Sequence, residues 1–144
     1  MQTMTTNWTF WALLSAGFAA LTAIFGKVGV QGVNSDLATL IRTVVILVLL
    51  AVIVGASGAY QAVGAVTGKT YLFLVLSGLA TGASWLCYYR ALQLGPASRV
   101  APIDKLSVVL VALFAFAFLG ERLSVREWLG IGLIAGGAAL VAIG

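Results

Sequence analysis

Four charged side chains lie within stretches of the chain that are otherwise apolar enough to cross a membrane. Arg42 lies in the second such stretch, Arg90 in the third, and the adjacent pair Asp104 and Lys105 in the fourth. A charge inside a bilayer is costly and usually marks a transport path or a partner. Because an aspartate is too short to reach the headgroups, Asp104 indicates a polar cavity, and we expect it to pair with Arg42 or Arg90.

The long cationic side chains have a second interpretation, in which their stems carry the charge out to the headgroups. This interpretation is favoured for Lys27 and Arg99, which lie near the ends of apolar stretches. For Arg42 and Arg90 both interpretations stay open.

Two features of the sequence support a polar path. Trp85 and Tyr89 lie inside the third apolar stretch, where their polar atoms need a partner and their ring faces could contact a ligand. Pro102 removes a helix hydrogen bond and predicts a kink close to Asp104 and Lys105. Since three of the four embedded charges are positive, the path suits a carboxylate or phosphate better than a simple cation.

The elements that carry these residues are five apolar stretches of helical length. A hydrocarbon core of about 30 Å needs about 20 apolar residues in a helix. The sequence therefore predicts an all-α integral membrane protein, a five-helix bundle forming one domain over residues 1–144. The expected spans are 8–29, 37–55, 70–94, 97–119 and 125–143.

Local signals set the expected span boundaries. Asn34, followed by Ser35 and Asp36, can cap the second helix. Gly95-Pro96 ends the third helix and lets the fourth begin, because proline is tolerated in a first turn. Ser124 and Glu127 have the spacing of a capping box ahead of the fifth helix.

Composition excludes several other classes of protein. The chain is 62% hydrophobic and only 8% charged, far from the balance of soluble domains. Its eight lysines and arginines form no basic patch, so we expect no nucleic-acid partner. With no histidine and one cysteine, we expect no metal site and no cofactor. Because Asp104 is the only acid within the apolar stretches, we also expect no enzyme activity.

Small residues indicate where helices could touch. Gly78 and Gly82 form one G-x-x-x-G pair in the third span, and Gly132 and Gly136 form another in the fifth. Such pairs let two backbones approach closely in lipid. The contact could lie within one chain or between subunits, and chance spacing among 17 glycines is the alternative.

The balance of positive charge bears on orientation. With five spans the loops on the N-terminal side carry three lysines and arginines (Lys69, Arg122, Arg126), and those on the other side also carry three (Lys27, Arg90, Arg99). Because orientation follows this bias, insertion in both directions is plausible. Two copies in opposite orientation would form an inverted pair with a site where the halves meet. We therefore expect a homodimer, which an antiparallel arrangement would suit.

Three segments resemble the EamA domain of the drug/metabolite transporter superfamily. They are 88–97 (YYRALQLGPA), 99–102 (RVAP) and 119–124 (LGERLS), and Lys27 and Arg42 also match that pattern. The resemblance covers nearly the whole chain and points to a short, single-domain, five-helix branch. It implies a multi-pass plasma-membrane carrier, in a bacterium or archaeon the inner membrane, that moves amino acids or other small metabolites. It also implies that 120–122 (GER) shapes a loop.

The function we expect is secondary transport of a small solute by alternating access in a dimer. The substrate path would use Arg42, Trp85, Tyr89, Arg90, Asp104 and Lys105. Two alternatives stay open: a non-transporting membrane subunit that regulates a partner, and a flippase-like component that carries a lipid headgroup.

Overall fold

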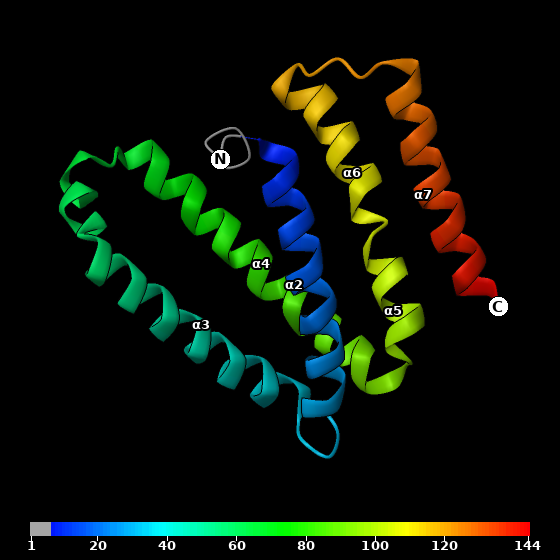
Figure 1. Ribbon diagram of the computed structural model, residues 1–144, viewed down its shortest axis with the longest axis horizontal. Helices are drawn as coiled ribbons and strands as arrows, with labels where there is room; N and C mark the ends of the chain where they lie inside the picture. Colours follow the sequence, from blue (N-terminus) through cyan, green and yellow to red (C-terminus); the bar gives the residue numbers. More distant parts are fainter. Residues whose placement is uncertain (1–6) are drawn as a thin grey trace. The chain divides into compact units, whose positions relative to one another are not determined.

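The computed structural model describes residues 7–144, and these form helices joined by short loops, with no strand among them (Figure 1). The helices are α2 (Trp8–Gly29), α3 (Ser35–Ser57), α4 (Gly68–Leu94), α5 (Ala97–Asp104), α6 (Ser107–Phe114) and α7 (Val125–Ile143). A short 3₁₀ helix, η1 (Ala59–Ala65), follows α3, and a π-helical turn, η2 (Ala115–Leu119), follows α6.

Five helical segments are long and apolar enough to cross a membrane, which confirms the expected architecture. They are α2, α3, α4, α7 and the run Ala97–Leu119 that contains α5, α6 and η2. Their lengths of 19 to 27 residues match the thickness of a hydrocarbon core. Large apolar side chains on these helices are mostly exposed, as expected of surfaces that face lipid.

The ends of the helices follow from local chemistry. The Asn34 side chain accepts hydrogen bonds from the Asp36 and Leu37 N–H groups, so α3 begins at Ser35, two residues earlier than expected. It ends two residues later than expected, because Gly58 adopts a left-handed φ of 71° that stops the helix. The glycine-rich stretch that follows is not an open loop, since most of it forms η1.

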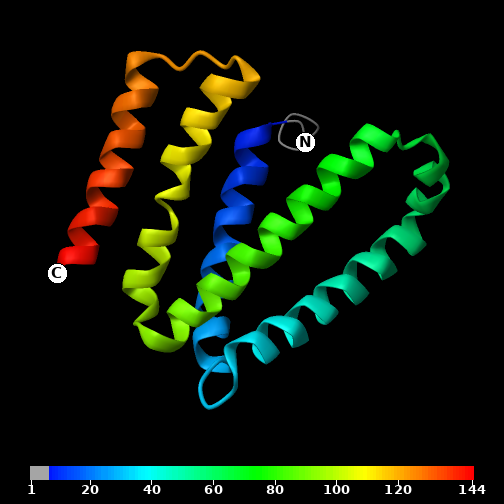
Figure 2. The same ribbon diagram turned by 180° about the vertical axis from the view of Figure 1, so that it is seen from behind.

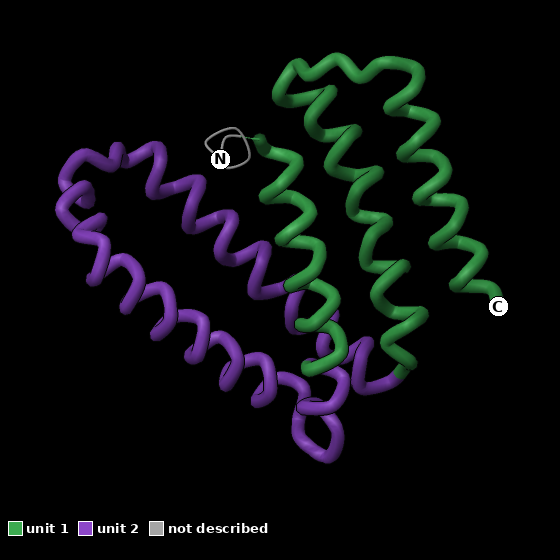
Figure 3. The backbone as a smooth tube through the Cα atoms, in the orientation of Figure 1, with its two compact units in different colours: residues 1–25, 95–144 green, residues 26–94 purple. Residues whose placement is uncertain are grey.

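The chain divides into two compact units (Figure 3). One unit, here called the α3–α4 unit, is Gly26–Leu94 and includes the last turn of α2. The other, the α5–α7 unit, holds Gly95–Gly144 and the earlier part of α2 up to Phe25.

In the α3–α4 unit the two long helices lie side by side, as both views show (Figures 1 and 2). Its buried side chains gather where these helices meet the end of α2: Val30, Ser35, Thr39, Tyr89 and Leu92. The two polar members are satisfied locally, because the Thr39 hydroxyl donates to the Ser35 carbonyl at 2.8 Å and the Ser35 hydroxyl donates to the Asp36 carboxylate at 3.3 Å. The core is therefore small and has no unpaired buried polar side chain.

In the α5–α7 unit, α7 packs against α5 and α6. The buried side chains of these elements are small: Ala112 on α6, Ala115 at the start of η2 and Ala138 on α7. Small residues allow close approach in lipid, where no hydrophobic force drives helices together. Arg99 Nη2 donates to the Gly144 carbonyl at 2.6 Å, which ties α5 to the residue that follows α7.

The fourth span is interrupted after Pro102. α5 ends at Asp104 and α6 begins at Ser107. Around this break the N–H groups of Leu106 and Val108 donate to carbonyls three residues back, at 3.0 Å each, instead of four. The tighter turn keeps these donors paired within the chain, which a span in hydrocarbon requires.

A first prediction concerns the cap of α3. Replacing Asn34 by alanine removes the acceptor of two N–H groups and should lower the free energy of unfolding by about 1 kcal/mol. The measurement is unfolding of the purified protein in detergent micelles by added sodium dodecyl sulfate, followed by circular dichroism. Asn34→Ser is the control, because serine also caps helices. Equal stability of the alanine variant and the parent would contradict this role.

Candidate functional site

The guanidinium of Arg42, on α3, lies on the aromatic face of α4. Its Cζ is 3.4 Å from the centre of the Trp85 ring and 5.2 Å from that of Tyr89. The two rings lie on one side of α4 because they are four residues apart. A cation within about 6 Å of a ring centre is attracted to the electron-rich face. Cation–π contacts thus join α3 to α4 inside their membrane spans.

Tyr89 is held from a second side by the end of α2. Its side chain is only 4% exposed. A Cβ placed on Gly26 would lie 3.1 Å from the Tyr89 Oη and 3.3 Å from its Cζ, closer than ordinary van der Waals contact. The Tyr88 ring meets Tyr89 edge-on, with centroids 6.4 Å apart. The position of the Tyr89 ring is therefore fixed by a glycine on α2 as well as by its own helix.

Two polar side chains fasten the last turn of α4. Lys27 Nζ donates to the Leu92 carbonyl at 2.6 Å, and Gln93 Nε2 donates to the Val33 carbonyl at 2.8 Å. The Leu92 carbonyl is one of the last four of its helix and has no partner within it. These bonds tie the end of α4 to α2 and to the loop before α3.

Lys27 and Arg99 differ from the expectation that their charges reach out to headgroups. Each donates to a carbonyl at 2.6 Å, Lys27 to Leu92 and Arg99 to Gly144, both near the C-terminal end of a helix. A cation is favoured there because the helix dipole is negative at that end. Both side chains therefore connect helices.

The α3–α4 unit carries more positive than negative charge near this site. Its cations include Lys27, Arg42 and Arg90, and its one carboxylate is Asp36. No ion pair joins Asp36 to Arg42, and the guanidinium of Arg42 donates no hydrogen bond within the unit. Arg90 Nη1 donates weakly to Gln93 Oε1, at 3.4 Å. Arg42 is therefore a cation within a span that has aromatic partners but no anionic one in its unit.

Asp104 and Lys105 form an ion pair with each other, with Oδ2 and Nζ 3.3 Å apart. Adjacent residues in a continuous helix point in different directions. These two meet because Asp104 is the last residue of α5 and Lys105 lies in the break before α6. The expected pairing of Asp104 with Arg42 or Arg90 would join the two units, and it stays a prediction.

The four glycines predicted to mark helix contacts have open space beside them. A Cβ added to Gly78, Gly82, Gly132 or Gly136 would meet no atom of the described residues within 4 Å. Their role as contact positions stays a prediction, and these faces are free to meet another surface.

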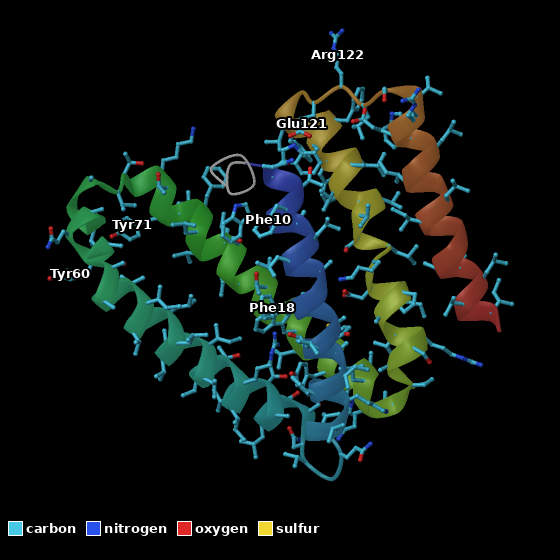
Figure 4. The ribbon with its side chains drawn as sticks, viewed as in Figure 1. Phe10, Phe18, Tyr60, Tyr71, Glu121 and Arg122 are labelled. Carbon is cyan, nitrogen blue, oxygen red and sulfur yellow. The ribbon has the colours of Figure 1, made fainter. Side chains whose placement is uncertain are left out.

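The GER segment lies in the loop before α7, where Figure 4 shows Arg122 projecting outward beyond Glu121. Gly120 has a left-handed φ of 69°, and the Glu121 N–H donates to the Ala115 carbonyl at 3.1 Å. This closure of η2 agrees with a loop-shaping role.

The sequence did not reveal two residues of the site. Gly26 was one of 17 glycines, and nothing in its surroundings signalled the approach of Tyr89. Gln93 lies three residues after Arg90 on the same side of α4, a spacing that could have suggested their contact. No group of three potential metal ligands (His, Cys, Asp or Glu) occurs among residues 7–144.

Comparison with known proteins assigns the chain. The profile of the EamA-like transporter family matches residues 6–143. The chain belongs to the EamA-like transporter family. A relative from Sinorhizobium sp., named "Uncharacterized transporter in cobO 3'region", is 63% identical over 140 residues, covering 97% of this chain and 99% of the relative. This EamA-like chain is thus a multi-pass membrane protein, which in bacteria lies in the inner membrane.

More distant relatives are named "Probable 4-amino-4-deoxy-L-arabinose-phosphoundecaprenol flippase subunit ArnE". The one from Hamiltonella defensa is 30% identical over 76 residues, covering 53% of this chain and 68% of the relative. The one from Yersinia pestis (strain Pestoides F) is 35% identical over 72 residues, covering 50% of this chain and 63% of the relative. No solved structure matches the chain.

A second prediction tests the stacking of Arg42. In a double-mutant cycle with Arg42→Met and Trp85→Leu, the two changes should be coupled by about 0.5–2 kcal/mol, the range of a cation–π contact. The measurement is again unfolding in mixed micelles. Tyr71 at the start of α4 supplies the control, since it lies about 20 Å along the helix from Trp85. Coupling of Arg42 to Trp85 no larger than to Tyr71 would rule the contact out.

Proposed function

We propose that this EamA-like transporter moves a small anionic solute and that Arg42 binds its carboxylate or phosphate. The observation that carries the proposal is the Arg42 guanidinium, stacked on Trp85 at 3.4 Å inside a membrane span, with no anion paired to it in the α3–α4 unit. An uncompensated charge at that depth is costly unless a ligand compensates it.

The geometry of the stack suits an oxyanion. A guanidinium lying on a ring uses its face for the aromatic contact and keeps its N–H donors at the edge of its plane. Those donors match a carboxylate or phosphate in a bidentate arrangement. The Trp85 and Tyr89 rings hold the group in place without competing for its hydrogen bonds. Arg90 adds positive charge one residue after Tyr89.

Asp104 and Lys105 extend the proposed path into the fourth span. They are charged residues within a segment that is otherwise apolar, and they lie where the helix is interrupted. Interrupted helices in transporters usually line a cavity, because irregular backbone is tolerated only there. In this proposal the pair contributes polar contacts, and Arg42 contributes the main charge.

We further propose that the chain works as a dimer by alternating access, with antiparallel copies as the favoured arrangement. Five spans place the two termini on opposite sides, and the loop charges are balanced at three against three. An inverted pair supplies the two related halves from which many transporters are built. The open faces beside Gly132 and Gly136 are available for a contact between copies.

A second candidate function is a subunit of a lipid-headgroup flippase. It is favoured by the likeness to the flippase subunits, which extends over about half of this chain. A phosphate group linked to a lipid presents the same oxyanion to Arg42 as a free solute. The two candidates therefore share the site and differ in the size of the molecule attached to the anion.

A third prediction tests the anion site. The midpoint temperature of thermal unfolding of the detergent-purified protein should rise when inorganic phosphate, L-glutamate or L-malate is added, because a ligand that binds the folded state stabilises it. Choline should leave this temperature unchanged. In the Arg42→Gln variant, the anion concentration needed for the same rise in midpoint temperature should be about tenfold higher or more, as expected for the loss of a hydrogen bond to a charged group. Arg126→Gln, the same charge change in the first turn of α7, is the matched control. Equal responses of the two variants would remove Arg42 from the site.

A fourth prediction tests the antiparallel pair. Reporters that signal only inside or only outside the cell, fused after Gly144, should both be active in one population of cells, since the loop charges give little bias. Adding two lysines to the loop between α2 and α3 should shift the signal to a single side. A single side for the unaltered chain would favour a parallel dimer or an oppositely oriented partner chain.

A further inference from the structure

We propose that Gly26 is a positioning residue for the anion site: its missing side chain sets the place of the Tyr89 ring, and through that ring the place of Arg42. This inference rests on the proposed function for its transport consequence. The positioning itself is a property of the folded chain and can be measured without any substrate.

The contact at Gly26 is exceptional among the glycines of the described chain. A Cβ there would lie 3.1 Å from the Tyr89 Oη, 3.3 Å from its Cζ and 3.4 Å from the Leu92 Cδ1. At the other described glycines, Gly95 aside, an added Cβ would meet nothing closer than 3.7 Å. The φ of Gly26 is not positive, so the backbone does not require glycine. What disfavours a larger residue at position 26 is the space occupied by the tyrosine.

Tyr89 has little freedom to move away from a methyl group at position 26. The ring is 4% exposed, and Leu92, beside it, is completely buried. The backbone of α4 is fastened nearby by the Lys27 bond to the Leu92 carbonyl and the Gln93 bond to the Val33 carbonyl. An added methyl group therefore has to displace the ring itself.

A displaced ring changes the surroundings of Arg42. The guanidinium lies 5.2 Å from the centre of the Tyr89 ring and 3.4 Å from that of Trp85. Because the Tyr89 ring is one of the two rings that attract the guanidinium, a shift of the tyrosine changes the position that the cation prefers. In this proposal Gly26 governs, through the Tyr89 ring, how the cation is presented to an anion.

The test uses Trp85 fluorescence in a chain whose other tryptophans, Trp8, Trp11 and Trp128, are replaced by phenylalanine. A cation on the indole face alters the emission, so Arg42→Gln defines the full change in emission maximum. Gly26→Ala should change the emission in the same direction as Arg42→Gln. Gly29→Ala, at an open position in the last turn of α2, should leave it unchanged.

A rescue experiment separates positioning from general packing. Tyr89→Phe removes the Oη atom that lies nearest to the added methyl group. Gly26→Ala combined with Tyr89→Phe should therefore return the Trp85 emission part of the way to that of Tyr89→Phe alone, because the Cζ position, 3.3 Å from the added methyl group, remains. In the binding assay with L-glutamate or inorganic phosphate, Gly26→Ala should weaken the apparent affinity roughly threefold to tenfold, as small misplacements of a binding group do, and the double variant should recover it.

Each outcome decides the proposal. A folded Gly26→Ala protein with unaltered Trp85 emission would overturn it, as would a double variant that folds without recovery. If Gly26→Ala fails to fold, recovery of both folding and emission in the double variant supports positioning, and failure of both variants makes Gly26 a packing residue only. Changed emission without any anion response in the parent would leave the positioning intact and reject the proposed function instead.

Discussion

In hydrocarbon every backbone N–H and C=O group must find its partner inside the protein, and the rest of this structure follows from that requirement. The five spans are helices because a helix satisfies its own backbone. The backbone groups at the helix ends need other partners. Asn34 accepts hydrogen bonds from two N–H groups of α3, and Gly58 and Gly120 end helices in left-handed conformations. The break after Pro102 also meets this requirement, because N–H groups there donate hydrogen bonds to carbonyls three residues earlier in the chain.

Hydrocarbon also disfavours charged side chains, and the chain stabilises three of its cations in three different ways. The Lys27 ammonium group donates a hydrogen bond to the Leu92 carbonyl at the end of α4. Lys105 takes its neighbour Asp104 as counter-ion, which the interruption of the helix permits. Arg42 lies on the rings of Trp85 and Tyr89. Of these three cations, Arg42 is the one that lies on aromatic rings and donates no hydrogen bond within its unit, and this difference makes it the candidate for binding an anion.

The architecture could be predicted from sequence because it depends on local properties. Span number follows from the length of apolar stretches, and the roles of Asn34, Gly95-Pro96 and Ser124 follow from residue type and position. Arg42, Trp85 and Tyr89 could be nominated singly, because each is unusual inside a span. That they touch could not be deduced, since the contact depends on the rotation of α3 and α4 about their axes. The role of Gly26 could not be predicted for the same reason. A glycine that makes room for a ring on another helix has no signal in the sequence around it.

The way Arg42 is held has a consequence for any protein that must take up and release an anion. An arginine paired with an internal carboxylate has to break that pair whenever it binds a ligand, and the freed carboxylate then becomes a buried charge without a partner. An arginine stacked on rings keeps its orientation while its edge donors remain available, so little ordering is needed on binding. The cost is that the orientation depends on the placement of the rings, because a neutral partner has no charge to steer the guanidinium. Tight packing around Tyr89 by Gly26, Leu92 and the fastened end of α4 supplies the rigidity that this arrangement needs.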